Sequence, residues 1–222
     1  MKKATSPIVW PVFIFLIMVI FPLNFTLAQH STVNLELDKK VEAFLKSNKN
    51  RWHDLNVPDS DGKLLYDIII RNGYTSGLEI GTSTGHSAIW IAWAFSKTNG
   101  KLITIEINER RYKEAIANFE AAGLSEYIDA RLGNAHDLVR KLQGPFDFVF
   151  SDADKDWYTN YFIDVAPKLK AGGCFAAHNV RPAGAGGISG TKAYLAHVMG
   201  LDNFTTTVNN TGGGLAISIK NN

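Results

Sequence analysis

The sequence is poor in several features that mark specialised classes of protein. It has one cysteine among 222 residues, so no disulfide can form within the chain. Its 23 lysines and arginines nearly balance its 21 aspartates and glutamates, and the net charge of +2 gives no argument for a nucleic-acid partner. It contains no internal repeat and no low-complexity tract. Cys174 stands in an apolar run, and we expect it to be buried as a small hydrophobic residue.

The first 28 residues differ from the rest of the chain, whose composition is typical of one globular domain. Lys2 and Lys3 precede an almost wholly apolar stretch, residues 8–21, and Thr26 and Ala28 place small residues before Gln29. This pattern favours a cleaved signal peptide. An uncleaved anchor stays open, because residues 8–28 are long enough to span a bilayer. Both the cleaved signal peptide and the uncleaved anchor predict an exported domain, which would be periplasmic, secreted or membrane-anchored. Such a domain would contact a membrane only through this segment. An anchor with the domain in the cytosol is a third alternative.

From residue 34 onward the apolar residues alternate between helical and strand periodicity. Asn34 is expected to cap a helix, and a turn-rich loop is expected over 56–62. The predicted helices are 63–72, 87–95, 109–122, 135–142, 157–169 and 191–199. The predicted strands are 78–81, 102–107, 127–132, 146–151, 174–178, 204–208 and 215–219. This alternation predicts a doubly wound, Rossmann-like α/β fold with seven strands, of which the last two form an antiparallel hairpin.

A glycine loop, Gly81 to Gly85, follows the first predicted strand. In a doubly wound sheet, ligands bind beyond the carboxyl ends of the strands, and glycine lets a ligand approach the backbone closely. A tight turn without a ligand is the alternative. Glu106 ends the second strand 21 residues after Gly85, where an acidic side chain accepts hydrogen bonds from the ribose of an adenosine.

The residues around the glycine loop favour S-adenosylmethionine over NAD. Their spacing, Glu-x-Gly-x-x-x-Gly, differs from the dinucleotide pattern that places a pyrophosphate at a helix N-terminus. Glu79 would repel a pyrophosphate but would hold the amino group of a methionine moiety. An NAD-dependent oxidoreductase is one alternative. An exported binding protein that has lost catalysis is another, because an exported enzyme would need a supply of the cofactor.

Two polar groups follow later strands. Asp152, Asp154 and Lys155 come directly after the strand 146–151, and such crowded charges need ligands, cations or solvent around them. His178 and Asn179 end the next strand, so they are expected to lie near Asp152. For the charged run after 146–151 the alternative is a solvent-exposed loop, and for His178 it is a buried core histidine.

The sequence resembles the small class I O-methyltransferases related to caffeoyl-CoA and catechol O-methyltransferases. The resemblance covers roughly residues 55–220. The motifs that carry it are Gly62 with Leu64-Leu65, the loop from Glu79 to Ser87, Ile105-Glu106-Ile107, Gly133-Asn134-Ala135, and Asp152-Ala153-Asp154-Lys155 after an apolar strand. Residues 29–222 would then form a methyltransferase domain.

The resemblance implies an S-adenosylmethionine-dependent methyltransferase that acts on the hydroxyl of a small molecule. It implies that a divalent cation binds Asp152 and the adjacent oxygens of the acceptor, while Lys155 receives the hydroxyl proton. It also implies a homodimer. The cofactor contacts expected on this basis are Glu79, Gly81, Thr82, Gly85, Ser87, Glu106, Ala135 and Asp154.

The sequence departs from the family at His178-Asn179, where the relatives carry Asp-Asn. A metal set of Asp152, His178 and Asn179 suits Mn²⁺, Fe²⁺ or Zn²⁺ better than Mg²⁺. The alternative is a site without metal in which His178 is the base. Five of the seven residues 181–187 are glycine or alanine, which predicts a mobile lid. This segment lacks the tryptophan and asparagine of the plant enzymes, so the plant substrate does not carry over.

Overall fold

The computed structural model describes residues 35–52, 54–182 and 188–222. The predicted signal segment, residues 1–28, and most of the predicted lid, at 183–187, lie outside these ranges. Contacts divide the chain into residues 1–37 and residues 38–222, and the second unit is described below. A helix runs over 35–48, as expected after Asn34, and its residues 38–48 belong to the second unit. None of the helices in the described ranges combines the length and the apolar character needed to cross a membrane.

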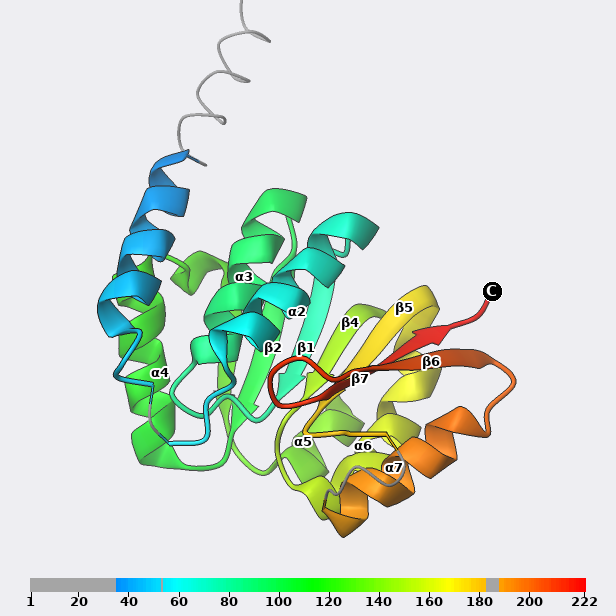
Figure 1. The fold of residues 1–222 in the computed structure, drawn as a ribbon. Helices are drawn as coiled ribbons and strands as arrows, with labels where there is room; N and C mark the ends of the chain where they lie inside the picture. Colours follow the sequence, from blue (N-terminus) through cyan, green and yellow to red (C-terminus); the bar gives the residue numbers. More distant parts are fainter. Residues whose placement is uncertain (1–34, 53, 183–187) are drawn as a thin grey trace, which may run out of the picture. The chain divides into compact units, whose positions relative to one another are not determined.

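The second unit is built on one sheet of seven strands in the order β3-β2-β1-β4-β5-β7-β6 (Figure 1). The first five strands pair in parallel, whereas β7 pairs antiparallel with both β5 and β6. This confirms the predicted doubly wound fold and its C-terminal hairpin. The strands are β1 (Ser76–Ile80), β2 (Lys101–Glu106), β3 (Ile128–Leu132), β4 (Phe146–Ser151), β5 (Leu169–His178), β6 (Phe204–Asn209) and β7 (Leu215–Lys220).

Helices cover both faces of the sheet (Figure 1). One face is covered by α2 (Asp59–Asn72), α3 (His86–Thr98) and α4 (Glu109–Ala122), and the other by α5 (Ala135–Lys141), α6 (Tyr158–Val165) and α7 (Ser189–Met199). Because both faces are covered, every residue of the central strand β4 is buried. Cys174 is also fully buried, as expected.

Several bounds differ from the prediction, among them those of β5, which begins at Leu169 rather than at Cys174, and of α3, which ends at Thr98 rather than at Phe95. The largest differences among the helices are at α2 and α6. The turn-rich loop expected over 56–62 is shorter, because α2 begins at Asp59 rather than at Lys63. Pro58 precedes the first turn, where its missing N–H costs nothing, and the acidic side chains of that turn favour the helix N-terminus. The helix expected over 157–169 is shorter as well. It ends at Val165, and Pro167 then lies in a 3₁₀ turn because proline cannot continue the hydrogen-bonding pattern of the helix.

The contact between α2 and α3 depends on a glycine. Gly62 is buried in α2, and a Cβ atom at this position would overlap the indole ring of Trp90 on α3. The two helices therefore approach more closely than any larger residue would allow.

We predict that Gly62→Ala lowers the free energy of unfolding by about 1–3 kcal/mol, the usual cost of overpacking a filled site. Urea unfolding measures this change. Gly200→Ala is the matched control, because a Cβ there meets its nearest atoms at 3.6 Å and Gly200 has a φ of −88°. Equal stability of the two variants would contradict the prediction.

Candidate active site

The carboxyl ends of four strands bring the predicted polar groups to one edge of the sheet. Ile80 at the end of β1 pairs with Ile105 of β2 and with Ser151 of β4. Ser151 in turn pairs with Ala177 of β5. The residues that follow these positions are therefore neighbours. They are Gly81, Glu106, Asp152 and His178.

The glycine loop between β1 and α3 requires glycine at both of its ends. Gly81 and Gly85 each have a φ of +98°, in the region that favours glycine. A Cβ on Gly81 would lie 2.8 Å from the carbonyl oxygen of Asp152, and one on Gly85 would lie 2.5 Å from the Phe119 ring. The loop thus fits closely against the end of β4 on one side and against α4 on the other.

A cavity of about 330 Å³ opens beside this loop. Five of the predicted site residues line it: Gly81, Glu106, Ala135, Asp152 and Asp154. Within it, the carboxylate of Glu106 is fixed by two backbone N–H groups, from Ser83 at 2.7 Å and from Asn108 at 2.8 Å. The carboxylate is therefore held in place before any ligand arrives.

Other predicted cofactor residues, among them Thr82 and Ser87, are buried and do not line this cavity. Glu79 is the most informative of them. Its Oε2 accepts from the Thr104 hydroxyl at 2.5 Å, while its Oε1 has no hydrogen-bond partner among the described residues. Burial raises the pKa of Glu79 to about 8, although the nearby Ser87 and Thr104 hydroxyls oppose this shift. A buried carboxyl oxygen without a partner is suited to receive a donor group of a ligand.

A second cluster forms around His178. Its Nδ1 lies 3.1 Å from Asp152 Oδ2, and its Nε2 lies 2.8 Å from Oδ2 of Asp61 on α2. Burial lowers the pKa of His178, but its hydrogen bonds to Asp152 and Asp61 outweigh this effect and raise it to about 9. On the other side, Lys155 Nζ donates to Asp152 Oδ1, and to the Tyr158 hydroxyl at 2.9 Å.

Two of the three predicted metal ligands, Asp152 and His178, are engaged by other side chains in this arrangement. Both ring nitrogens of His178 are engaged by carboxylates, and both oxygens of Asp152 accept hydrogen bonds. Asn179 is half-buried and has a φ of 57°. In the described part of the chain, no three His, Cys, Asp or Glu side chains are arranged to hold a metal ion. The set stays a prediction, and no step below depends on it.

Several contributions to the site were not predicted. His136 and Tyr161 line the cavity, and two further contributions come from residues before and within α2. Asp61 was assigned to a loop, and nothing local distinguishes it from a solvated acidic residue in a first helical turn. The segment before α2 was missed as well. Asp54 forms ion pairs with Arg110 and Arg111, and its carbonyl oxygen accepts from the Ser83 hydroxyl. This segment therefore lies against the glycine loop, with Leu55 75% exposed at the cavity.

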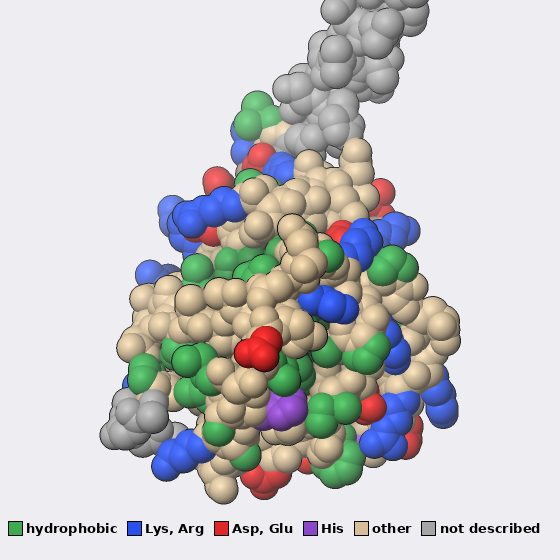
Figure 2. Space-filling view, turned by 90° about the vertical axis from the view of Figure 1, so that its right-hand side faces the viewer, with side chains coloured by type: hydrophobic (Ala, Val, Ile, Leu, Met, Phe, Trp, Pro, Cys, Tyr) green, Lys and Arg blue, Asp and Glu red, His purple; other side chains and the backbone are tan. Residues whose placement is uncertain are grey.

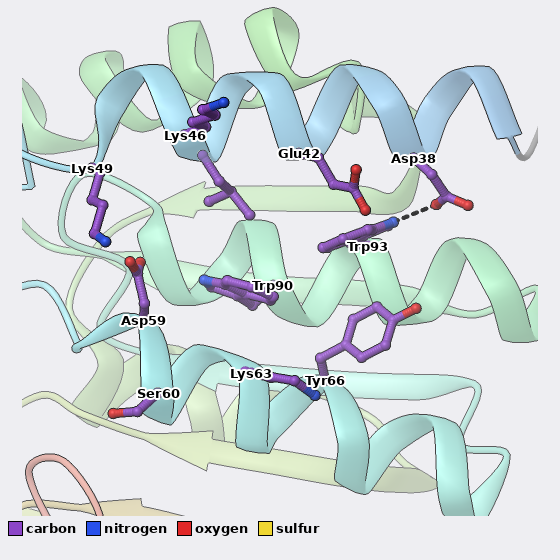
Figure 3. Close-up of a pocket in the computed structure, with 11 residues that line it drawn as sticks. Asp38, Glu42, Lys46, Lys49, Asp59, Ser60, Lys63, Tyr66, Trp90 and Trp93 are labelled. Atoms are coloured by element: carbon purple, nitrogen blue, oxygen red, sulfur yellow. Dashed lines mark hydrogen bonds between the residues drawn. The ribbon is translucent and has the colours of Figure 1, made fainter.

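A larger hollow, of about 730 Å³, lies away from the sheet edge, between the helix over 38–48, α2 and α3 (Figure 3). Tyr66, Trp90 and Trp93 form its aromatic wall, and the Trp93 indole N–H donates to Asp38 at 2.6 Å. None of the predicted site residues lines it. On the face shown in Figure 2, Lys and Arg side chains are scattered rather than gathered into one patch.

Comparison with known proteins adds independent information. Residues 29–206 match the family model described as O-methyltransferase. A catechol O-methyltransferase from Niastella koreensis is 37% identical over 130 residues, which are 57% of this chain and 58% of that protein. Caffeoyl-CoA O-methyltransferase 1 from Eucalyptus globulus is 32% identical over 136 residues, 59% of this chain and 55% of that one. The matches thus span little more than half the length of these relatives.

Solved structures are similar over more of the chain. The O-methyltransferase from Bacillus cereus in complex with SAH has a TM-score of 0.71 and 25% identity, and the match covers 82% of this chain and 90% of that one. The O-methyltransferase TomG from Streptomyces achromogenes in complex with SAM has the same TM-score, identity and coverage.

The raised pKa of Glu79 predicts a pH dependence of stability. The folded protein holds a proton on Glu79 that the unfolded chain releases near pH 4.5, so this contribution to stability falls as the pH rises towards about 8. We expect the free energy of unfolding of Glu79→Gln, relative to that of the wild type, to rise by about 2–4 kcal/mol over this range. Urea unfolding at a series of pH values, without ligand, measures it. Parallel pH profiles for the two proteins would show the prediction to be wrong.

Proposed function

Since the chain belongs to the O-methyltransferase family, we propose that it transfers a methyl group from S-adenosylmethionine to a hydroxyl oxygen of a small molecule. One observation carries this proposal. The glycine loop, Glu106 and the run from Asp152 to Asp154 line a single cavity at the carboxyl edge of the sheet, with Lys155 next in the chain. The similar O-methyltransferases from Bacillus cereus and Streptomyces achromogenes were solved in complex with SAH and SAM, which supports the choice of cofactor.

The residues around the cavity have groups suited to such a cofactor. Glu106 still has lone pairs for the two ribose hydroxyls, because each of its oxygens accepts one backbone N–H. Glu79, which is buried beside the glycine loop and does not itself line the cavity, is the residue that we assign to the amino group of the methionine moiety, through its Oε1. Gly81 and Ala135 line the cavity without bulky side chains. When bound, S-adenosylmethionine supplies a methyl group that an oxygen nucleophile can take from a sulfonium.

Lys155 is the residue to which we assign the acceptor's hydroxyl proton. Its amino group contacts Asp152 Oδ1 and the Tyr158 hydroxyl, so two hydrogen bonds fix its position. The Asp152 carboxylate stabilises the positive charge that Lys155 carries after it has taken the proton. The protein otherwise contributes alignment of the acceptor oxygen with the methyl group.

We predict that Glu106→Ala weakens SAH binding about 10- to 100-fold, because hydrogen bonds to a charged group contribute about 1.5–3 kcal/mol. Isothermal titration calorimetry measures the affinity. The exposed Glu120 of α4 provides the control, since Glu120→Ala removes the same charge away from the cavity. Binding of NAD in place of SAH would favour an oxidoreductase and would rule out the proposed function.

We predict that Lys155→Ala lowers kcat about 10²- to 10⁴-fold, the usual contribution of a positioned acid or base, while SAH affinity stays close to that of the wild type. Transfer of a labelled methyl group to a panel of phenols and catechols measures this. The exposed Lys192 of α7 offers a control in Lys192→Ala. If the wild type bound SAH but methylated no acceptor of the panel, a binding protein without catalysis would be favoured instead.

A further inference from the structure

Four ionisable side chains form a continuous chain that reaches the cavity at Asp152. Asp61, His178, Asp152 and Lys155 are linked in that order by hydrogen bonds. Asp61 is fully buried and His178 is 4% exposed, so water screens their charges only weakly. The charges therefore have to be compensated within the cluster itself.

The hydrogen bonds determine the charge of His178. An ionised carboxylate accepts hydrogen bonds and donates none. Each ring nitrogen of His178 faces a carboxylate oxygen, at 3.1 Å from Asp152 and at 2.8 Å from Asp61, so both nitrogens donate when the two carboxylates are ionised. An imidazole that donates from both nitrogens is positively charged and has no lone pair with which to bind a metal.

The cluster is electrically neutral when Lys155 is protonated. In that state the negative charges of Asp61 and Asp152 balance the positive charges of His178 and Lys155. When Lys155 is neutral and ready to take the acceptor's proton, the net charge of the cluster is −1. A divalent cation would leave the buried site with excess positive charge in either state, which is costly. An aspartate in place of His178 would instead give the cluster two excess negative charges when Lys155 is protonated, which is the charge that a divalent cation compensates.

The turn between β6 and β7 closes the cluster on its far side. The backbone N–H of Gly213 donates to Asp61 Oδ2 at 2.8 Å. A Cβ atom on Gly213 would overlap the His178 ring, and one on Gly212 would overlap the Asp61 carboxylate. Residues 212 and 213 therefore pack directly on the ion pair and leave no room for a further ligand on that side.

We propose that methyl transfer by this protein uses no divalent cation, and that His178, held between Asp61 and Asp152, supplies the positive charge in its place. This inference rests on the proposed function. Asp61 and His178 are positioning residues, because they act on the acceptor through Asp152. An acceptor with one hydroxyl then suffices, since no ion is present for two adjacent oxygens to chelate.

Titration of metal-free protein with Mn²⁺, followed by the electron paramagnetic resonance signal of the free ion, tests the inference directly. We expect the wild type to leave the signal unchanged and His178→Asp to bind Mn²⁺ stoichiometrically. His197→Asp makes the same exchange on α7, outside the cluster, and we expect it to bind none. Stoichiometric binding by the wild type overturns the proposal, whether or not His178→Asp folds.

A second measurement separates this inference from the proposed function. We expect SAH affinity and turnover of the wild type to be unchanged by a chelator. We also expect a phenol with one hydroxyl to be methylated within about tenfold of the rate of the matching catechol. If SAH does not bind in the presence or in the absence of Mn²⁺, the proposed function fails. If SAH binds but turnover requires Mn²⁺, only the present inference fails.

Discussion

The site depends on the close approach of two backbone segments that are far apart in the sequence. The N–H of Asp152 donates to the carbonyl of Ile80 at 2.8 Å, and Gly81, the residue after β1, has no space for a side chain against Asp152. This contact joins the end of β1, with its glycine loop, to the end of β4, with its charged run. The cavity and the charged cluster are neighbours because these two strands are neighbours in the centre of the sheet, where helices leave towards opposite faces.

Much of this arrangement could be predicted, because the helices and strands that build it have clear local sequence patterns. The bounds of α4 and β4 agree with the prediction, since an amphipathic stretch closed by Gly123 and an unbroken apolar run are both unambiguous. The positions of Glu106 and Asp152 at strand ends follow once those strands are placed. Five of the predicted residues line one cavity for the same reason.

The contacts that could not be predicted join residues that are far apart in the sequence. Asp61 and His178 are separated by 117 positions, and no periodicity connects them. The pairing of Asp54 with Arg110 and Arg111 depends in the same way on how the segment before α2 folds back over the glycine loop. The boundary errors have local causes. Asp59 to Gly62 resemble a turn in composition, yet they form a helix because the acidic side chains of the first turn suit its N-terminus.

The contact of the β6–β7 turn with Asp61 couples the edge of the sheet to the charged cluster. The Gly213 N–H and the Nε2 atom of His178 both lie 2.8 Å from the same oxygen, Asp61 Oδ2. A shift of the turn would therefore remove one of the donors of a fully buried carboxylate, which is costly. Substitutions in the hairpin, although it lies outside the cofactor cavity, would in this way alter the charged groups at the carboxyl ends of β4 and β5.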